Sequence, residues 1–336
     1  MLRRSLLVLG AGGAPGLLAL PLFSSPLFSS EARADTSLPD KGLRILVGFT
    51  AGGGAELMAR AVLPRLQLRT GRHIAIENKP MGSGVAAGEY LKKGLADGTV
   101  VAFLPSTTLA VTLAGAAFPF DIQSELVPLT VAGTFQVELV VSPTIGVTTF
   151  ADYVAWLKAG PPERARLGLT STDAYLRIYA MMIGREIGLP LVAVPHQGAA
   201  PLAAAVRQGE IPAGLGSVAA LRPHDRSGVM KVLMVSGPKR LSTLRTVPTA
   251  AELGHPNLEL DEWYGFFAAS VTPIPIAEEW SRQLRDVLGE NEVAAALAQL
   301  GLDVETSTKD EAAARFAARL QAWKGRMESF GLKPGD

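Results

Sequence analysis

Short apolar runs alternate along this chain with longer segments in which apolar residues recur at helical spacing. The apolar runs cover residues 43–49, 73–77, 100–104, 139–142, 165–169, 191–194 and 229–235. The helical segments begin at residue 55 and cover residues 150–158, 173–187 and 201–208. Runs of this length are typical of buried strands, and the segments between them are too long for hairpin turns. The pattern predicts an α/β fold with mainly parallel sheets.

The last helix is the one that the sequence marks most clearly. Thr308 and Glu311 have the spacing of a capping box, in which each side chain bonds to the backbone N–H of the other residue. An apolar stripe follows at intervals of four and three residues, formed by Phe316, Leu320, Trp323, Met327 and Phe330. We expect this stripe to pack against a sheet of the same chain, with a dimer interface as the alternative. Pro64 lies within the first helical segment, and we expect it to kink that helix or to end it early.

The first 34 residues have the pattern of an export signal. Arg3 and Arg4 precede an apolar stretch interrupted by prolines, and Ala32-Arg33-Ala34 is the small-x-small pattern that signal peptidase recognises. We expect residues 1–34 to be a signal peptide that is cleaved after Ala34. An N-terminal membrane anchor is the alternative, but the apolar stretch is shorter than the ~20 residues that a span needs. The adjacent arginines leave the twin-arginine export route open beside the general one.

Composition narrows the classes of function. The chain has 336 residues, with 32 Lys and Arg against 31 Asp and Glu, and no cysteine. Cleavage after Ala34 would remove three basic residues and one acidic residue, leaving 29 against 30 and a net charge of −1. This balance argues against a nucleic-acid partner. The lack of cysteine excludes disulfides, thiolate metal sites and cysteine nucleophiles, and the length predicts two domains.

Gly52, Gly53 and Gly54 separate the first strand from the first helix. Backbone N–H groups at the start of a helix lack helical partners, so a glycine turn at this place attracts an anion. A dinucleotide turn is one alternative, because Glu77 ends the second strand where a ribose-binding acid would lie, but the third glycine of that motif is missing. A tight turn without a ligand is the other alternative. A P-loop is excluded because no Gly-Lys-Ser/Thr follows.

A second polar loop, Thr170-Ser171-Thr172-Asp173, also lies between a strand and a helix. Hydroxyl groups and helix N-terminal amides together form a nest of the size of a carboxylate. Simple N-capping by Thr172 or Asp173 is the alternative for this loop taken alone. Because two such loops occur in different halves of the chain, we expect them to hold one small anion from both sides.

The sequence gives little support for catalysis. Its four histidines lack the spacing of a metal site, and no serine has the flanking glycines of a nucleophile elbow. We therefore predict no catalytic residue, no metal site and no cofactor.

Seven motifs, taken in order, resemble those of the Bug-type (TctC-like) extracytoplasmic solute-binding proteins of tripartite tricarboxylate transporters. The resemblance runs from about Leu43 to the C-terminus. Its motifs are ILVGFTAGGGAELMAR at 45–60, IENKPMGSGVAA at 76–87, ADGT at 96–99, FPFD at 118–121, VPHQGAAP at 194–201, VPTAAELG at 247–254 and WYG at 263–265. The chain departs from the family pattern at Thr50-Ala51, at Glu56, where the family commonly has Asp, and at His196, where it has Tyr. These departures concern the shape of the ligand pocket.

The resemblance implies a type II periplasmic-binding-protein fold, with two α/β lobes, a hinge of two crossover strands and a ligand cleft between them. The first lobe would hold residues 35–137 and 258–336, and the second residues 138–257. It also implies a periplasmic monomer that captures a small carboxylate and delivers it to the membrane permease subunits of the transporter. An exported enzyme acting on a carboxylate and the sensory subunit of a signalling system are the alternatives.

We predict that the ligand contacts residues from both polar loops and from the turns that follow other strands. These are Gly52, Gly53, Gly54, Glu56, Ser106, Thr107, Thr170, Ser171, Thr172, Asp173, Gln197, Gly198, Ala199, Gly216 and Ser217. If the Glu56 carboxylate points into the cleft, it repels additional ligand charge, which favours mono- or dicarboxylates over citrate. If Glu56 only decorates the first turn of its helix, this selectivity is lost.

Overall fold

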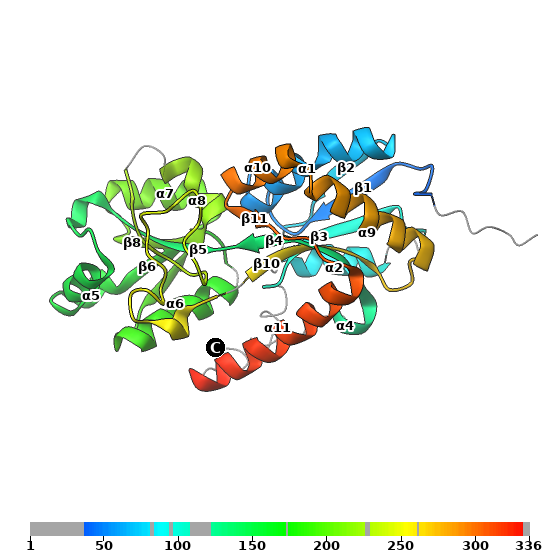
Figure 1. Ribbon diagram of the computed structural model, residues 1–336. Coiled ribbons are helices and arrows are strands. Elements are labelled where there is room, and N and C mark those ends of the chain that lie inside the picture. Colours follow the sequence, from blue (N-terminus) through cyan, green and yellow to red (C-terminus); the bar gives the residue numbers. More distant parts are fainter. Residues whose placement is uncertain are drawn as a thin grey trace, which may run out of the picture. The chain divides into compact units, whose positions relative to one another are not determined.

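The computed structural model describes residues 37–80, 84–93, 97–107, 122–172, 174–225, 229–260 and 262–331 (Figure 1). The signal peptide predicted for residues 1–34, with its cleavage after Ala34, and the motif at 118–121 lie outside the described residues. Within the described ranges, no helix is long and apolar enough to cross a membrane.

A six-stranded sheet, which we call sheet A, collects strands from both ends of the chain. In spatial order its strands are β11 (Leu302–Val304), β4 (Leu126–Phe135), β10 (Glu262–Ala269), β3 (Val100–Pro105), β1 (Leu43–Val47) and β2 (Ile74–Asn78). Helices α1 (Gly54–Thr70), α9 (Ile274–Leu288) and α10 (Asn291–Gln299) share one buried cluster on this sheet. Helices α2 (Val85–Lys93) and α11 (Lys309–Ser329) share another, and Figure 1 shows the two groups on opposite faces.

A five-stranded sheet, sheet B, holds the middle of the chain. Its strands are, in order, β7 (Val192–Pro195), β6 (Arg166–Leu169), β8 (Ala213–Ser217), β5 (Val137–Val141) and β9 (Lys231–Val235). One buried cluster contains α5 (Phe150–Lys158) and α6 (Ala174–Ile187), and another contains α7 (Ala199–Gln208) and α8 (Val218–Asp225). Short helical turns complete the chain at α4 (Ile122–Glu125), η2 (Pro143–Ile145), η3 (Pro162–Ala165) and η4 (Pro256–Leu258).

The predicted α/β class with two sheets is confirmed, but both sheets are mixed. Strand β1 is parallel to β2 and β3, and β6 is parallel to β7 and β8. Strands β4, β10 and β11 pair antiparallel in sheet A, and β5 pairs antiparallel with β8 and β9 in sheet B. The expectation of mainly parallel sheets is wrong for β4, β5 and β10, which pair antiparallel with each of their neighbours. Parallel strands need a crossover connection, whereas β4 continues directly into β5 of the other sheet through Gln136.

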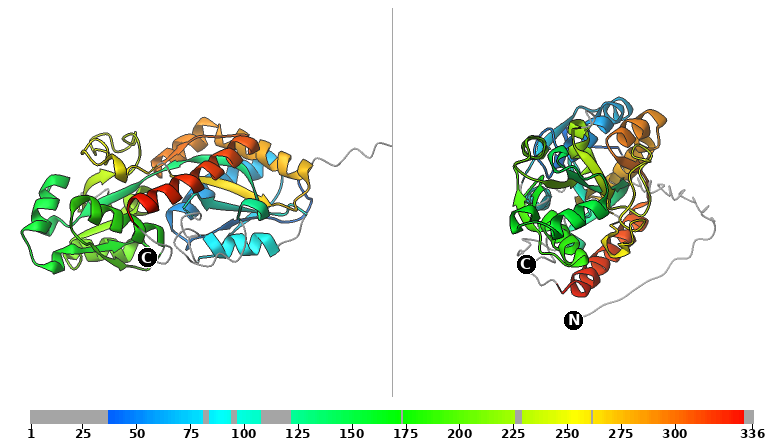
Figure 2. Two further views of the ribbon diagram at one scale, coloured as in Figure 1. Left: turned by 90° about the horizontal axis from the view of Figure 1, so that it is seen from below. Right: turned by 90° about the vertical axis from the view of Figure 1, so that its left-hand side faces the viewer.

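The C-terminal helix forms as predicted, and its capping box is present. The Thr308 side chain accepts from the Glu311 backbone N–H, and the Glu311 side chain accepts from the Thr308 N–H. Phe316 is buried with sheet A, whereas Trp323 and Met327 are buried with α5 and α6 of sheet B. Helix α11 therefore contacts the cores of both sheets, along the course that Figure 2 shows in red.

Pro64 does not end the first helix, which continues to Thr70. The buried residues Met58, Ala59, Val62 and Leu66 fix α1 on sheet A on both sides of this proline. Tertiary packing of an apolar face supplies most of a helix's stability, so one lost backbone hydrogen bond is tolerated.

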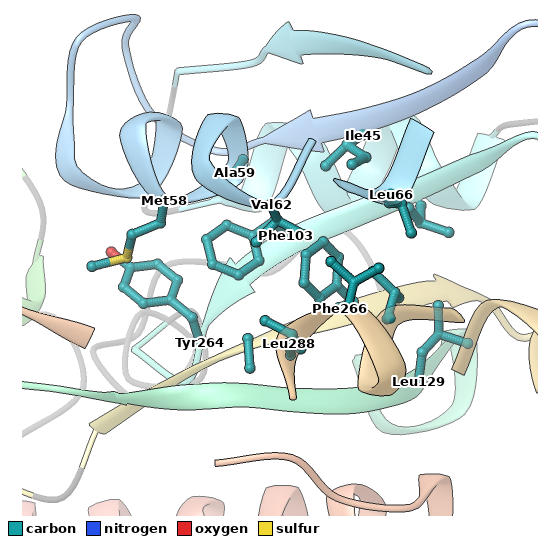
Figure 3. Packing of buried hydrophobic residues seen from close by; sticks show 14 of the residues in the cluster. Ile45, Met58, Ala59, Val62, Leu66, Phe103, Leu129, Tyr264, Phe266 and Leu288 are labelled. Carbon is teal, nitrogen blue, oxygen red and sulfur yellow. The ribbon is translucent and has the colours of Figure 1, made fainter. Parts of the chain in front are cut away.

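Aromatic rings on sheet A form the core beneath α1 (Figure 3). The Phe103 ring stacks on Tyr264 with centroids 4.9 Å apart and contacts Phe266 at 4.8 Å. Met58 and Val62 of α1 belong to the same cluster. This packing fixes α1 on sheet A.

Candidate functional site

A cavity of about 690 Å³ lies where the strands of both sheets end. Its wall includes the turns that follow β1, β3, β6, β7 and β8, and the carboxyl ends of strands are the usual place of ligand sites in α/β folds. The polar and glycine residues of the wall are Gly48, Thr50, Gly52, Gly53, Gly54, Thr107, Thr170, Ser171, Thr172, His196, Gln197, Gly198, Ser217 and His224. The two polar loops predicted from the sequence therefore share one cavity.

The backbone of the glycine loop leaves the first N–H groups of α1 without a side-chain partner. Gly52 has a φ of 76°, in the left-handed region that glycine adopts without strain. Gly53 is the N-cap of α1, and it makes no side-chain capping bond, so the first N–H groups of the helix have no capping side chain. Such groups carry partial positive charge and suit an anion.

Glu56 does not face the cavity. Its side chain is only 3% exposed and turns back toward the loop, where Oε2 accepts from the Gly52 N–H at 3.2 Å. The guanidinium of Arg60, one turn further along α1, donates to Oε1. The carboxylate is therefore already paired, and the condition for its repulsion of ligand charge is not met. Glu56 supports the glycine loop from behind.

The loop at residues 170–172 continues from β6 and leads into α6. The Thr170 N–H donates to the Leu215 carbonyl at 3.1 Å, which fixes the start of the loop beside β8. Gly216, on β8, is not among the described wall residues. It lets this loop pack close to β8, because a Cβ at Gly216 would lie 2.4 Å from Thr170 Cγ2. Asp173 lies outside the described residues.

The turn after β7 brings a third helix N-terminus to the cavity. The His196 N–H donates to the Leu169 carbonyl at 2.9 Å, so this turn is joined to β6. Gly198, with a φ of 113°, is the N-cap of α7 and makes no side-chain capping bond. Gln197, Gly198 and Ala199 all lie on the wall, as does Ser217, whose Oγ accepts from the Ala220 N–H at 3.3 Å.

The two residues predicted after β3 separate in the structure. Thr107 lies on the wall, whereas Ser106 is fully buried behind it. The Ser106 N–H donates to the Trp263 carbonyl at 2.7 Å, and its hydroxyl donates to the Glu262 carboxylate. Ser106 therefore joins the end of β3 to β10 and is not on the described part of the wall.

Several residues of the wall were not among those predicted from the sequence to contact the ligand. Tyr264 lies on the wall, and its ring is between Phe103 and Phe135, at centroid distances of 4.9 and 4.5 Å. The WYG motif contains Tyr264 and could have indicated it. Phe135 at the end of β4 and Tyr175 in the first turn of α6 also line the cavity, and no local sequence pattern marks them.

The described residues of the wall include no Lys, Arg, Asp or Glu, so the wall has no permanently charged side chain among them. Burial, with a smaller contribution from the charge of Glu262, raises the pKa of Tyr175 well above its ordinary value, so this phenol stays uncharged. The part of the chain that the structure describes has no group of three or more His, Asp or Glu side chains arranged to hold a metal. The arrangement offers N–H groups and hydroxyls to an anion.

Comparison with known proteins gives consistent matches. The model of the "Tripartite tricarboxylate transporter family receptor" matches residues 58–332. The protein BugT of Bordetella pertussis is 26% identical over 307 residues, which cover 91% of this chain and 94% of BugT.

Two solved structures from Rhodopseudomonas palustris share the fold. One, the protein Rpa4515 with adipate, has a TM-score of 0.80 at 23% identity, and the match covers 88% of this chain and 99% of that protein. The other, MatC with bound malate, has a TM-score of 0.77 at 19% identity and covers 86% and 99%.

Proposed function

Since this chain belongs to the family of tripartite tricarboxylate transporter receptors, we propose that it is an extracytoplasmic solute-binding protein. It captures a small carboxylate in the cavity that both sheets line. One observation carries the proposal: the starts of α1 and α7, both without capping side chains, meet the hydroxyl loop at residues 170–172 around one cavity. Oriented N–H groups with nearby hydroxyls bind a carboxylate without a fixed counter-charge.

The ligand in this proposal is a mono- or dicarboxylate. Two relatives of the same fold bind malate and adipate, which are dicarboxylates. The neutral wall supports this range, because a third carboxylate would find no fixed positive side chain among the described residues. The cavity volume suits a small organic acid, and the aromatic rings of Phe135 and Tyr264 would contact its carbon chain.

Capture would couple to closure of two lobes. We assign residues 35–137 and 258–336 to the first lobe and residues 138–257 to the second. A ligand held by the loops at 52–54 and 170–172 stabilises the closed arrangement over the open one, and the permease subunits of the membrane transporter recognise the closed form. The protein works as a monomer, without a cofactor and without catalysis.

Export belongs to the same proposal. Ala32-Arg33-Ala34 and the family to which the chain belongs both support a periplasmic protein whose signal peptide is removed after Ala34. N-terminal sequencing of the protein from the cell envelope is expected to begin at Asp35. A cytoplasmic protein that retains Met1 would contradict export.

The proposal is tested by calorimetric titration with a panel of mono-, di- and tricarboxylates. We expect at least one mono- or dicarboxylate to bind, and Ser171→Ala to weaken that binding by roughly 10- to 100-fold. Ser242→Ala, a change of the same type in an exposed turn far along the chain, is the matched control and should leave affinity unchanged. Binding that survives Ser171→Ala intact would place the ligand elsewhere. Conversion of the bound acid to a product would favour the exported enzyme.

A further inference from the structure

Two imidazoles, those of His196 and His224, lie on the described part of the cavity wall. Its described side chains are apolar or neutral, apart from the imidazoles of His196 and His224. Imidazole is the side chain that gains a positive charge between about pH 5 and 8. His196 and His224 are therefore the side chains among the described wall residues that can supply a positive charge to a ligand.

The ring of His196 has a fixed orientation. Its Nδ1 lies 2.9 Å from the Val194 carbonyl oxygen, and its backbone N–H is bonded to the Leu169 carbonyl. A carbonyl oxygen only accepts hydrogen bonds, so Nδ1 keeps its proton. The nitrogen that remains for a ligand is Nε2, which in the neutral ring carries a lone pair and accepts.

We infer that His196 is a specificity-determining residue, which takes up one proton when the second carboxylate of a dicarboxylate binds. This inference rests on the proposed function, because it concerns the ligand of the same cavity. A carboxylate oxygen and a neutral Nε2 both present lone pairs and repel each other. Protonation at Nε2 turns this contact into a charge-assisted hydrogen bond. A monocarboxylate, held by the helix N-termini alone, needs no such proton.

The other titratable side chains among the described wall residues are His224 at the end of α8, Tyr175 at the start of α6 and Tyr264 on β10. Glu56 lies behind the glycine loop and is paired with Arg60. The side chains of Asp173, Asp225 and Arg226 are not described. Asp173 follows the hydroxyl loop and Arg226 follows α8, and the experiment below therefore includes a substitution at each of these two positions.

The experiment is calorimetry with pairs of acids of equal chain length, such as adipate with hexanoate and succinate with butyrate. Titrations in buffers of different ionisation enthalpy count the protons taken up, and pH values between ~6.5 and ~8 keep both carboxyl groups ionised. We expect uptake of up to one proton for the dicarboxylate and none for the monocarboxylate. The dicarboxylate affinity should rise by up to about tenfold for each unit that the pH falls.

Four variants test which side chain takes up the proton when the dicarboxylate binds. His196→Gln should abolish both the proton uptake on dicarboxylate binding and the pH dependence of the dicarboxylate affinity. His224→Gln, Asp173→Asn and Arg226→Gln should keep both the uptake and the pH dependence. Dicarboxylate binding without proton uptake, or uptake that persists in His196→Gln, would overturn the inference. Loss of proton uptake in any one of His224→Gln, Asp173→Asn or Arg226→Gln would overturn it as well. If no carboxylate of either class binds at any pH, the proposed function itself fails.

Discussion

At the scale of single residues, the position of Glu56 explains how a glycine loop is held open for a ligand. A chain of three glycines has many conformations, and an unsupported loop would have to be ordered at each binding event. The Glu56 carboxylate bonds to the Gly52 N–H and is itself held by Arg60. The loop is therefore ordered in advance by a buried acid that does not reach the cavity.

Glu56→Ala is expected to lower the free energy of unfolding by about 1–3 kcal/mol, because Gly52 loses its acceptor and a charged hydrogen bond disappears. Ligand affinity should fall with it, through loss of loop order. Glu56→Gln keeps an acceptor oxygen and should have a smaller effect on both. Chemical denaturation and calorimetry measure the two quantities. If Glu56→Gln selectively improved binding of tricarboxylates, the carboxylate would have to act on the ligand directly.

Gly52→Ala is expected to destabilise the protein by about 1–2 kcal/mol, because an L-residue there must adopt the left-handed conformation. The cause is conformational alone, since a Cβ at this position has no heavy atom within 4 Å. Gly52→Asn is the matched control, because Asn enters this region more readily. Urea denaturation of both variants should show the smaller loss for Asn. Equal losses would point to a steric origin.

At the scale of elements, α11 joins the two sheets through a buried polar contact. The Trp323 indole N–H donates to Glu262 Oε1 at 2.9 Å, and the Ser106 hydroxyl donates to Oε2. Trp323 also contacts the Tyr175 ring edge-on at 5.6 Å, and Tyr175 lines the cavity. Helix α11 thus contacts the start of β10 directly. It is also linked to the cavity wall through the Tyr175 ring, which Trp323 contacts.

Trp323→Phe is expected to lower the free energy of unfolding by about 1–3 kcal/mol, because it removes one donor from a carboxylate that stays buried. Glu262 is 1% exposed, so water cannot replace the lost bond easily. In the double variant with Glu262→Gln the loss should be smaller than the sum of the single losses, as a double-mutant cycle would show. Strict additivity would mean that the indole and the carboxylate do not interact.

At the scale of the whole molecule, surface carboxylates link stability to pH. The Arg282 guanidinium lowers the pKa of Glu279, the Arg240 guanidinium lowers that of Glu252, and the Thr308 backbone N–H lowers that of Glu311. A carboxyl whose folded pKa lies below its unfolded value stabilises the fold above the unfolded value. That contribution disappears as the pH falls through the folded one.

We therefore expect the free energy of unfolding to decline as the pH falls below about 4.5. Glu279→Gln should flatten this decline, and Glu328→Gln, at an exposed position of α11, is the matched control. Urea denaturation at a series of pH values measures the effect. A decline of equal slope in the wild type and Glu279→Gln would show that this ion pair does not contribute to it.

The sequence by itself determined the α/β class, the capped C-terminal helix and the family. The motifs from 45–60 to 263–265 occur in the order of the family, and the match over residues 58–332 confirms that resemblance. The sequence also predicted that the loops at 52–54 and 170–172 lie at the ends of strands. These features are readable because they depend on local periodicity and on the backbone needs of glycine and hydroxyl residues.

Only the tertiary structure decided where individual side chains point and which distant residues meet. Glu56 and Ser106 lie next to wall residues in sequence, yet each is turned toward a partner, Gly52 in one case and Glu262 in the other. Strands β4 and β10 are paired along sheet A although more than a hundred residues separate them. A sequence pattern shows which residues are apolar or polar, but the direction of a side chain depends on neighbours that only folding brings together.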